Sequence, residues 1–260
     1  MVSSACEVMF MPWADVGKDT NIGPFTAWPW KKSRVSNSAI ADHLENYFKG
    51  HVDHYGKPVS TITILSADDS FGTVAPKLMD KARLAVDCLL FAEIYPAVKA
   101  AVRTDNTYMA PPTADRYQLV KQQFAPGDSS FVVNIGGTSH MGQIGKLKVT
   151  CPWDRGGTSF PDEELLNGLA ALLGTRVKAA DRERIERSLE WFRLAHTSGD
   201  GSSTLTKVVM MATAFEILFG LPRHNKTKLF IQSVRDRLDR ANTRTKTGVD
   251  AIGKTKTYSL

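Results

Sequence analysis

The chain has 260 residues, 42% of them hydrophobic, and its 33 Lys and Arg against 27 Asp and Glu give a net charge of +6. This is the composition of an ordinary globular protein with one large domain or two smaller ones. The three cysteines have no Cys-x-x-Cys spacing, which argues against a disulfide framework. The N-terminus lacks a signal-peptide pattern, and the apolar windows are too short for a membrane span. We therefore expect a cytoplasmic protein.

The first segment, residues 1–36, is rich in aromatic residues, Pro and Gly and includes Trp13, Trp28 and Trp30. This composition predicts irregular chain that is held on a surface by large, mostly buried side chains. The alternative is an aromatic platform for nucleic-acid bases, because the basic segment 31–34 follows directly.

A helix and a strand are predicted next along the chain. Apolar residues on one face of 38–49 predict a helix that stops at Gly50, and the β-branched, nearly alternating segment 59–65 predicts a strand. His51 and His54 lie between the two elements, three residues apart. No further ligand is placed to join them in a metal site, so we expect both histidines to be exposed to solvent.

The middle of the chain mixes further helices and strands. Pro76 opens a predicted helix, which we expect Pro96 to kink or end. The segments 131–135 and 146–150 have the pattern of strands. A Pro followed by three acidic residues begins a predicted helix within 161–174, which ends at its final Gly.

Few residues in this region offer catalytic chemistry. The Gly-Gly-Thr-Ser segments 136–139 and 156–159 are most simply turns. Ser139 beside His140 raises the alternative of a hydrolase, but the strand–turn–helix setting of a nucleophile and an acid partner are both missing from the sequence. Cys88 lies among apolar residues, as an inert core thiol does. We therefore assign no catalytic residue, no metal ligand and no cofactor.

Three consecutive helices are predicted in the last third of the chain. The first, 181–196, carries an apolar stripe at steps of three and four residues. The second, 203–219, is apolar almost all round, so we expect it to be the central, buried helix, ending at Gly220. The third covers 225–238. Adjacent helices with short joins predict part of an up-and-down bundle.

These elements predict an α+β protein with three parts. A mixed α/β domain with short strands occupies 1–176, and an antiparallel helical bundle follows over 181–240. In 241–260 no apolar period survives and Thr, Lys, Arg and Gly dominate, which predicts a disordered basic tail.

The predicted bundle resembles the HEPN superfamily, in particular its ApeA-like branch. The matching residues are the helix that ends in ERSLEWFRLA, the AFEILFG segment 214–220 and the KLFIQSVRDRL segment 228–238. The GPFTAWPW segment 23–30 also looks like the chain that precedes such bundles. The resemblance implies RNA binding or metal-independent RNA cleavage, often in bacterial defence or toxin systems, and a homodimer through the bundle.

The family's catalytic motif is an Arg followed, after four to six residues, by a His on a later helix. None of the six His in this chain has an Arg at that spacing before it. The resemblance therefore implies a C-terminally incomplete HEPN protein that is RNA-associated but has lost nuclease activity, and it leaves open whether the chain is an enzyme.

The distribution of charge along the chain indicates which residues could bind RNA. The whole positive excess lies in 181–260, which holds 15 basic against 9 acidic residues. We expect Arg235, Arg237 and Arg240 to contact RNA phosphates, because a local basic excess favours a polyanion.

Glu216 falls on the helix that we expect to be most buried, where a charge needs a partner. Arg184, Arg187 or Lys228 could form that ion pair and fix the helix register. The alternative places Glu216 as a polar residue beside the family's active groove.

A second function class follows from the incompleteness of the bundle. An apolar seam formed by Ile217, Phe230 and Val234 would be left open and could accept a helix of another chain. The chain would then be a structural or partner-binding protein with no role in nucleic-acid binding.

Overall fold

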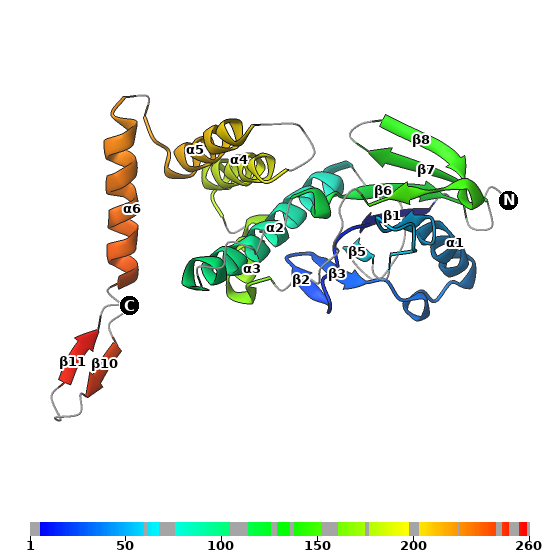
Figure 1. The fold of residues 1–260 in the computed structure, drawn as a ribbon, viewed down its shortest axis with the longest axis horizontal. Coiled ribbons are helices and arrows are strands. Elements are labelled where there is room, and N and C mark those ends of the chain that lie inside the picture. Colours follow the sequence, from blue (N-terminus) through cyan, green and yellow to red (C-terminus); the bar gives the residue numbers. More distant parts are fainter. Residues whose placement is uncertain are drawn as a thin grey trace.

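The structure, a computed structural model, contains a seven-stranded antiparallel sheet and, among the residues it describes, six α-helices (Figure 1). The predicted α+β class is therefore confirmed. The described residues are 6–59, 62–67, 76–104, 114–125, 129–135, 138–151, 161–174, 177–197, 203–222, 224–242, 246–249 and 255–258.

The large sheet has the strand order β2-β3-β5-β1-β6-β7-β8, and every neighbouring pair is antiparallel. Met9 of the central strand, for example, pairs with Leu65 on one side and with Lys121 on the other. The strands are β1 (Cys6–Met11), β2 (Thr20–Ile22), β3 (Phe25–Pro29), β5 (Thr63–Ser66), β6 (Val120–Phe124), β7 (Ser130–Ile135) and β8 (Thr138–Gln143).

Strand β1 shows that the prediction of irregular chain for residues 1–36 was wrong. Successive side chains of a strand point to opposite faces of the sheet. Met9 and Met11 lie in one apolar core, whereas Val8 and Phe10 lie in a second core on the other face. Because both faces are covered, β1 is apolar at four consecutive positions, from Val8 to Met11, and lacks the alternation that predicts a half-exposed strand.

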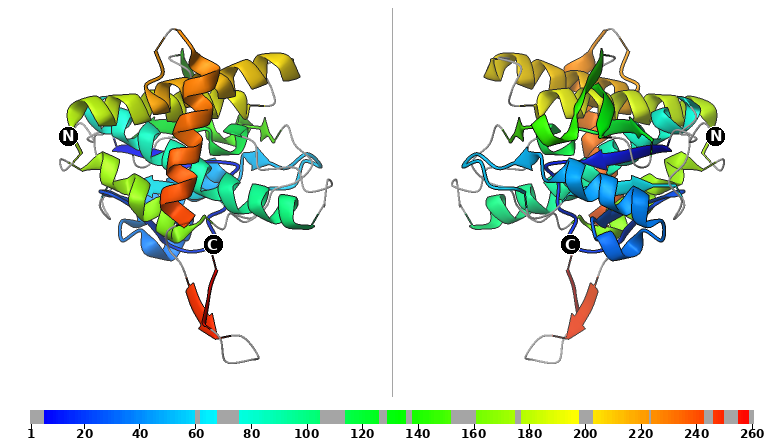
Figure 2. Two further views of the ribbon diagram at one scale, coloured as in Figure 1. Left: turned by 90° about the vertical axis from the view of Figure 1, so that its left-hand side faces the viewer. Right: turned by 90° about the vertical axis from the view of Figure 1, so that its right-hand side faces the viewer.

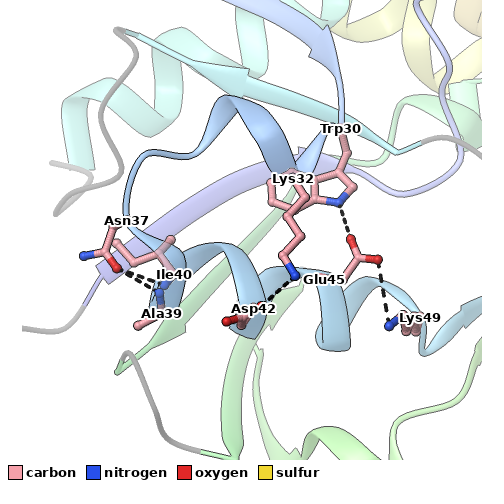
Figure 3. A network of polar contacts seen from close by, with 8 residues as sticks. All are labelled: Trp30, Lys32, Asn37, Ala39, Ile40, Asp42, Glu45 and Lys49. Atoms are coloured by element: carbon pink, nitrogen blue, oxygen red, sulfur yellow. Dashed lines mark hydrogen bonds and ion pairs between the residues drawn. The ribbon is translucent and has the colours of Figure 1, made fainter.

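Helix α1 (Ser38–Phe48), which the sequence predicts over 38–49, covers one face of the sheet. The side chain of Asn37 caps it by accepting hydrogen bonds from the backbone N–H groups of Ala39 and Ile40, at 3.0 and 3.3 Å (Figure 3). Leu44 and Phe48 face the core that contains Phe10. The helix is thus held by one cap and one apolar face.

Helices α2 (Pro76–Thr104) and α3 (Glu163–Ala170) cover the other face. Both begin where the sequence predicts. Of the two outcomes predicted at Pro96, a kink or an end, the end is not seen, because α2 continues to Thr104. A proline in a helix removes one intrahelical hydrogen bond to the carbonyl four residues earlier. That carbonyl, of Ala92, instead accepts a hydrogen bond of 2.9 Å from the backbone N–H of Asp162.

Helices α4 (Ala179–Ala195) and α5 (Thr204–Phe219) form a hairpin that lies outside α2 (Figure 1). Helix α4 packs on α2 through Phe91 and Phe192, whose ring centroids are 4.7 Å apart. Helix α5 packs on α4, and the Ser188 hydroxyl donates a 2.8 Å hydrogen bond to the Ala214 carbonyl. The order from the sheet outwards is therefore α2, α4 and α5, with α5 outermost.

Helix α6 (Lys226–Asn242) leaves the hairpin and does not lie along it (Figure 2). Its first turns meet the C-terminal end of α5, through contacts of Phe230 with Phe215 and Phe219. Among the described residues α4 and α5 pack side by side and α6 meets the end of α5, so the predicted antiparallel bundle of three helices is not confirmed.

The remaining elements are short. Strands β4 (His51–Val52) and β9 (Val149–Thr150) pair in parallel, and 3-10 turns occupy 32–34, 114–117, 144–146 and 171–173. In the segment 241–260, for which we predict disorder, β10 (Lys246–Val249) and β11 (Thr255–Tyr258) pair antiparallel. None of the helices, within the described residues, is long and apolar enough to cross a membrane.

Candidate functional site

The outer face of α5 carries an unusual set of exposed apolar side chains. Leu205, Val208, Val209 and Phe215 are 73%, 59%, 56% and 38% exposed, and of the whole helix only Ala214 is fully buried. The prediction of a central, buried α5 was therefore wrong. A helix that is apolar all round needs neighbours on every side, whereas α4 covers one side and α6 turns away.

The exposed residues follow helical spacing. Leu205, Val208, Val209, Ala212 and Phe215 recur at steps of three, one, three and three, which places them along one face. We call this set the α5 stripe. Its members extend over about 15 Å of the helix, given a rise of about 1.5 Å per residue.

The turn between α5 and α6 closes one end of the stripe. Gly220 takes the left-handed conformation, with φ 60° and ψ 42°, so that the backbone N–H of Leu221 donates to the Glu216 carbonyl at 3.0 Å. Asn225 also has a positive φ, of 58°, just before α6 begins. These two residues direct the first turn of α6 across the last turn of α5.

This geometry corrects the predicted partner of Glu216. Its carboxylate pairs with the ammonium group of Lys226, in the first turn of α6, and not with Arg184, Arg187 or Lys228. Both side chains are partly exposed, so the pair is not the buried ion pair that the sequence predicts. The pair joins α5 to α6 at the turn.

A small pocket opens where the α5 stripe reaches this turn. Its volume is about 190 Å³. The rings of Phe215 and Phe230, with centroids 5.8 Å apart, form part of its wall. We call it the corner pocket; its lining is Ala212, Phe215, Glu216, Leu221, Lys226, Thr227 and Phe230.

The charges of α6 are mostly positive. Lys226 is paired with Glu216, whereas Lys228 and Arg235 are exposed on α6 without an ion pair to another described residue. Arg237 and Arg240 belong to the same helix, but their side chains lie outside the described part of the chain. The structure therefore places only Arg235 of the three predicted phosphate-binding arginines at an exposed surface.

A second concave surface, of about 750 Å³, runs along α1 between this helix and the segments near Ser129 and Leu147. The charges of α1 are largely satisfied within the chain. Asp42 pairs with Lys32 at 2.7 Å, and Glu45 accepts a 3.1 Å hydrogen bond from the Trp30 indole N–H (Figure 3). The groove therefore offers few charges that are ready to receive a ligand.

His43, a polar residue that lines this groove, is also part of the packing between α1 and the sheet. The ring of His43 is buried, stacks on Phe124 with centroids 4.3 Å apart, and lies 3.2 Å from the Gln122 amide nitrogen. These contacts fix the ring as part of the packing between α1 and the sheet. We regard the groove as structural rather than as the main site.

Two of the early tryptophans are buried, as predicted. Trp13 and Trp28 lie in the interior, and the guanidinium of Arg34 stacks 4.4 Å from the centre of the Trp28 ring. The Trp28 indole N–H donates to the Ser66 hydroxyl. Trp28 is thus occupied by the chain itself and does not form a platform for bases.

His51 and His54 are not a pair. His54 is exposed, as predicted, but His51 is buried among Phe10, Trp13 and Tyr47. Burial lowers the pKa of His51 to about 4. Among the described residues no cluster of three or more His, Cys, Asp and Glu side chains is placed to hold a metal ion.

Other reactive groups lie in the core or outside the described side chains. Burial raises the pKa of the Cys88 thiol to about 12, which makes it a poor nucleophile. Burial also raises the pKa of Asp87 to about 7, although Arg193 lies 2.9 Å away and opposes this shift. Ser139 and His140 belong to β8, but their side chains are outside the described set.

Comparisons with protein-family models, with curated proteins and with solved structures found no match to this chain. The resemblance to the HEPN superfamily therefore stays a prediction. The α5 stripe and the corner pocket are the features on which a functional proposal can rest.

Sequence reasoning did not identify these two features. The stripe residues belong to the predicted helix 203–219. Because the residues on the other side of this helix are equally apolar, the sequence does not show which face is exposed. The pocket depends on the turn at Gly220 and Asn225, which brings residues of two helices together.

Proposed function

We propose that the protein binds another polypeptide through the outer face of α5. The carrying observation is the exposure of Leu205, Val208 and Val209 side by side on one helix face. Scattered exposed apolar residues are ordinary, but a contiguous apolar patch marks an interaction surface. The neighbouring corner pocket adds a concave end to this surface.

The binding surface differs from the seam that the sequence predicts. The three seam residues, Ile217, Phe230 and Val234, are only partly exposed in the structure. The open surface lies instead on the face of α5 that points away from α4. The proposal therefore keeps the predicted class of partner-binding protein and moves its contact face.

RNA association is the second candidate function. Its support is the charge of α6, which has five basic and two acidic residues, and the exposure of Lys228 and Arg235. Residues at 235, 237 and 240 spread over more than one side of a helix, and Asp236 and Asp239 lie between them. A continuous basic track is thus missing, and we place RNA binding second.

One comparison of variants tests both candidates. A library of displayed peptides is selected for binding to the wild-type protein and to the double variant Leu205→Asp, Val209→Asp. Thr206→Asp is the matched control, because Thr206 is an exposed polar residue on the same helix. We expect the selected peptides to bind wild type and control alike and to lose at least about tenfold in affinity on the double variant.

RNA association is tested by measuring the binding of a labelled single-stranded RNA to the same proteins. Binding that falls steeply with salt, weakens in Arg235→Glu and is unchanged in the double variant would favour RNA association. Peptides that bind the double variant as well as the wild type would contradict polypeptide binding through α5.

A further inference from the structure

Helix α6 has an apolar side of its own, which begins at the corner where α6 meets α5. Phe230, Ile231 and Val234 lie on this side at helical spacing, and Ile231 is 44% exposed. Resting on the proposed function, we infer that α6 closes over the α5 stripe in a second conformation and thereby keeps the partner polypeptide from binding. The structure shows the open conformation.

The first contact of such a closed state is already present. The Phe230 ring lies against Phe215 and Phe219, with centroids 5.8 and 5.7 Å away. Phe215 is the last member of the α5 stripe, and Phe230 is the first apolar residue on the matching side of α6. The two apolar sides therefore meet at one end, and closure extends an existing contact along both helices.

This contact also sets the register of the closed state. If α6 runs antiparallel to α5 from the Phe215–Phe230 contact, Val234 falls opposite Ala212, and Leu238 falls opposite Val208. A branched side chain then faces the smallest residue of the stripe, which allows the helices to approach closely. Further along, two larger apolar residues face each other.

The lengths of the helices and of their connection suit an antiparallel pair. Helix α5 spans Thr204–Phe219, α6 spans Lys226–Asn242, and residues 220–225 join them. Connections of about two to eight residues commonly join antiparallel helices. The direction of α6 is set by single positive-φ residues at the two ends of this connection, Gly220 and Asn225. Movements of whole helices are usually absorbed at a few such positions between elements.

Closure buries apolar side chains and leaves charged ones in water. Gln232, Arg235 and Asp236 are exposed and lie on the side of α6 opposite Phe230 and Val234. They would still face solvent after α6 had closed, so no unpaired charge among them is transferred to an apolar contact. The ion pair of Glu216 and Lys226 lies at the turn and spans the two helices in the open state already.

The covalent connection favours α6 over any other occupant of the stripe. A segment held by a short connection acts at an effective concentration in the millimolar range, whereas a second copy or a partner must bind from solution. A partner polypeptide therefore has to compete with α6 for the same apolar face. Closure would lower the apparent affinity for the partner by the fraction of molecules that are closed.

Cross-linking of the full chain tests whether the closed state forms. The variant Val208→Cys, Leu238→Cys pairs two positions that face each other only after closure, and Val208→Cys, Asp236→Cys moves the second thiol to the opposite side of α6. We expect mild oxidation to form the 208–238 disulfide at least about tenfold faster than the 208–236 disulfide, because a disulfide needs Cα atoms within about 7 Å. The wild-type chain, whose own cysteines are buried or half-buried, serves as the blank. Equal rates for the two pairs would overturn the inference.

A charge on the apolar side of α6 tests what drives closure. Val234→Asp, added to the 208–238 pair, should slow the cross-link by about tenfold or more, because closure would then bury a carboxylate. Gln232→Asp adds the same carboxylate on the exposed side of α6 and should leave the rate unchanged. Equal slowing by both substitutions would contradict closure through the apolar side.

Peptides selected on the wild-type protein test whether closure controls binding. We expect the oxidised 208–238 variant to bind them at least about tenfold more weakly than the same variant after reduction. Equal binding by the two forms would overturn the inference. If the 208–238 disulfide has no advantage while the peptides still need Leu205 and Val209, the inference fails and the proposed function stands. If the disulfide forms selectively but no peptide binds any form, the proposed function fails, and with it the inhibitory role of α6.

Discussion

The backbone carbonyl of Ala92 in α2 accepts a hydrogen bond from the backbone N–H of Asp162, at 2.9 Å. Ala92 lies four residues before Pro96, so its carbonyl has no donor within the helix. The segment that leads into α3 supplies the missing donor. This single bond explains how α2 continues through Pro96, and it ties α2 to the start of α3.

Asp162 contacts α2 through its backbone N–H and caps α3 through its side chain. Two substitutions separate these roles. The Asp162 side chain caps α3 by accepting from the Leu165 N–H at 2.9 Å, so Asp162→Ala should cost about 1 kcal/mol of unfolding free energy. Asp162→Pro also removes the backbone N–H and should cost about 1–3 kcal/mol more, because the Ala92 carbonyl is buried. The φ of –66° at this position already suits proline.

Urea unfolding of the two Asp162 variants measures the difference, with Asp162→Asn as a control that keeps a capping oxygen. Equal stabilities of Asp162→Ala and Asp162→Pro would show that the Ala92 carbonyl does not need this donor.

His51 makes the stability of the protein fall in acid. Burial lowers its pKa to about 4, from an ordinary value of 6.5, so the unfolded chain binds a proton more readily than the folded one between these values. The corresponding stability is fully present above about pH 6.5 and is lost as the pH falls towards 4, up to about 3 kcal/mol. His51→Phe should remove this loss, and His54→Gln should keep it, when unfolding is followed from pH 7 to pH 4.

Asp87 gives the opposite dependence. Burial raises its pKa to about 7, so the folded chain binds a proton more readily than the unfolded one above the ordinary value of 3.8. Stability from this residue is fully present below about pH 3.8 and is lost as the pH rises through about 7. In Asp87→Asn the stability relative to wild type should therefore increase between pH 5 and pH 8. A constant difference across this range would mean that Arg193 keeps the carboxylate ionised throughout.

The ion pair between Glu216 and Lys226 should contribute little to stability. Their side chains are 36% and 42% exposed, and water screens such a pair. A double-mutant cycle with Glu216→Gln and Lys226→Met should give a coupling free energy of about 0.5 kcal/mol. A coupling of several kcal/mol would restore the register-fixing role that the sequence predicts for Glu216.

Local patterns predicted those elements whose causes lie within a few residues. The apolar face of α1, the Pro at the start of α2 and the acidic start of α3 each act over one helix, and each element was found in place. β1 was missed because its two faces are buried in different cores, which no local pattern records. The local pattern left open whether α2 ends at Pro96, because the donor that replaces the lost hydrogen bond comes from Asp162, far along the chain.

The candidate site was missed for a related reason. Gly220 predicted the end of α5, but the direction of α6 depends on the backbone of Asn225 and on the contacts of Phe230. The sequence shows that α5 is apolar and cannot show which of its faces is covered. Whether a helix is buried depends on the elements that pack against it. Here α6, which we expected to pack along α5, meets it at its end.

The exposed stripe of α5 should be replaceable without loss of stability. Leu205, Val208 and Val209 contribute little to the core, so changing all three to Lys should alter the unfolding free energy by less than about 1 kcal/mol, since surface substitutions rarely do more. Lys is also a better helix former than Val. Binding of a fluorescent dye that detects apolar surface should fall sharply in the triple variant.

Ala214→Leu is the matched substitution on the covered face of the same helix. Ala214 is buried against α4, where its carbonyl accepts from Ser188, so the larger side chain should cost about 1–3 kcal/mol. The two variants together separate the faces of α5 in solution. If the triple Lys variant unfolds at much lower urea while Ala214→Leu is tolerated, the outer face of α5 is covered by this chain itself, and polypeptide binding there is excluded.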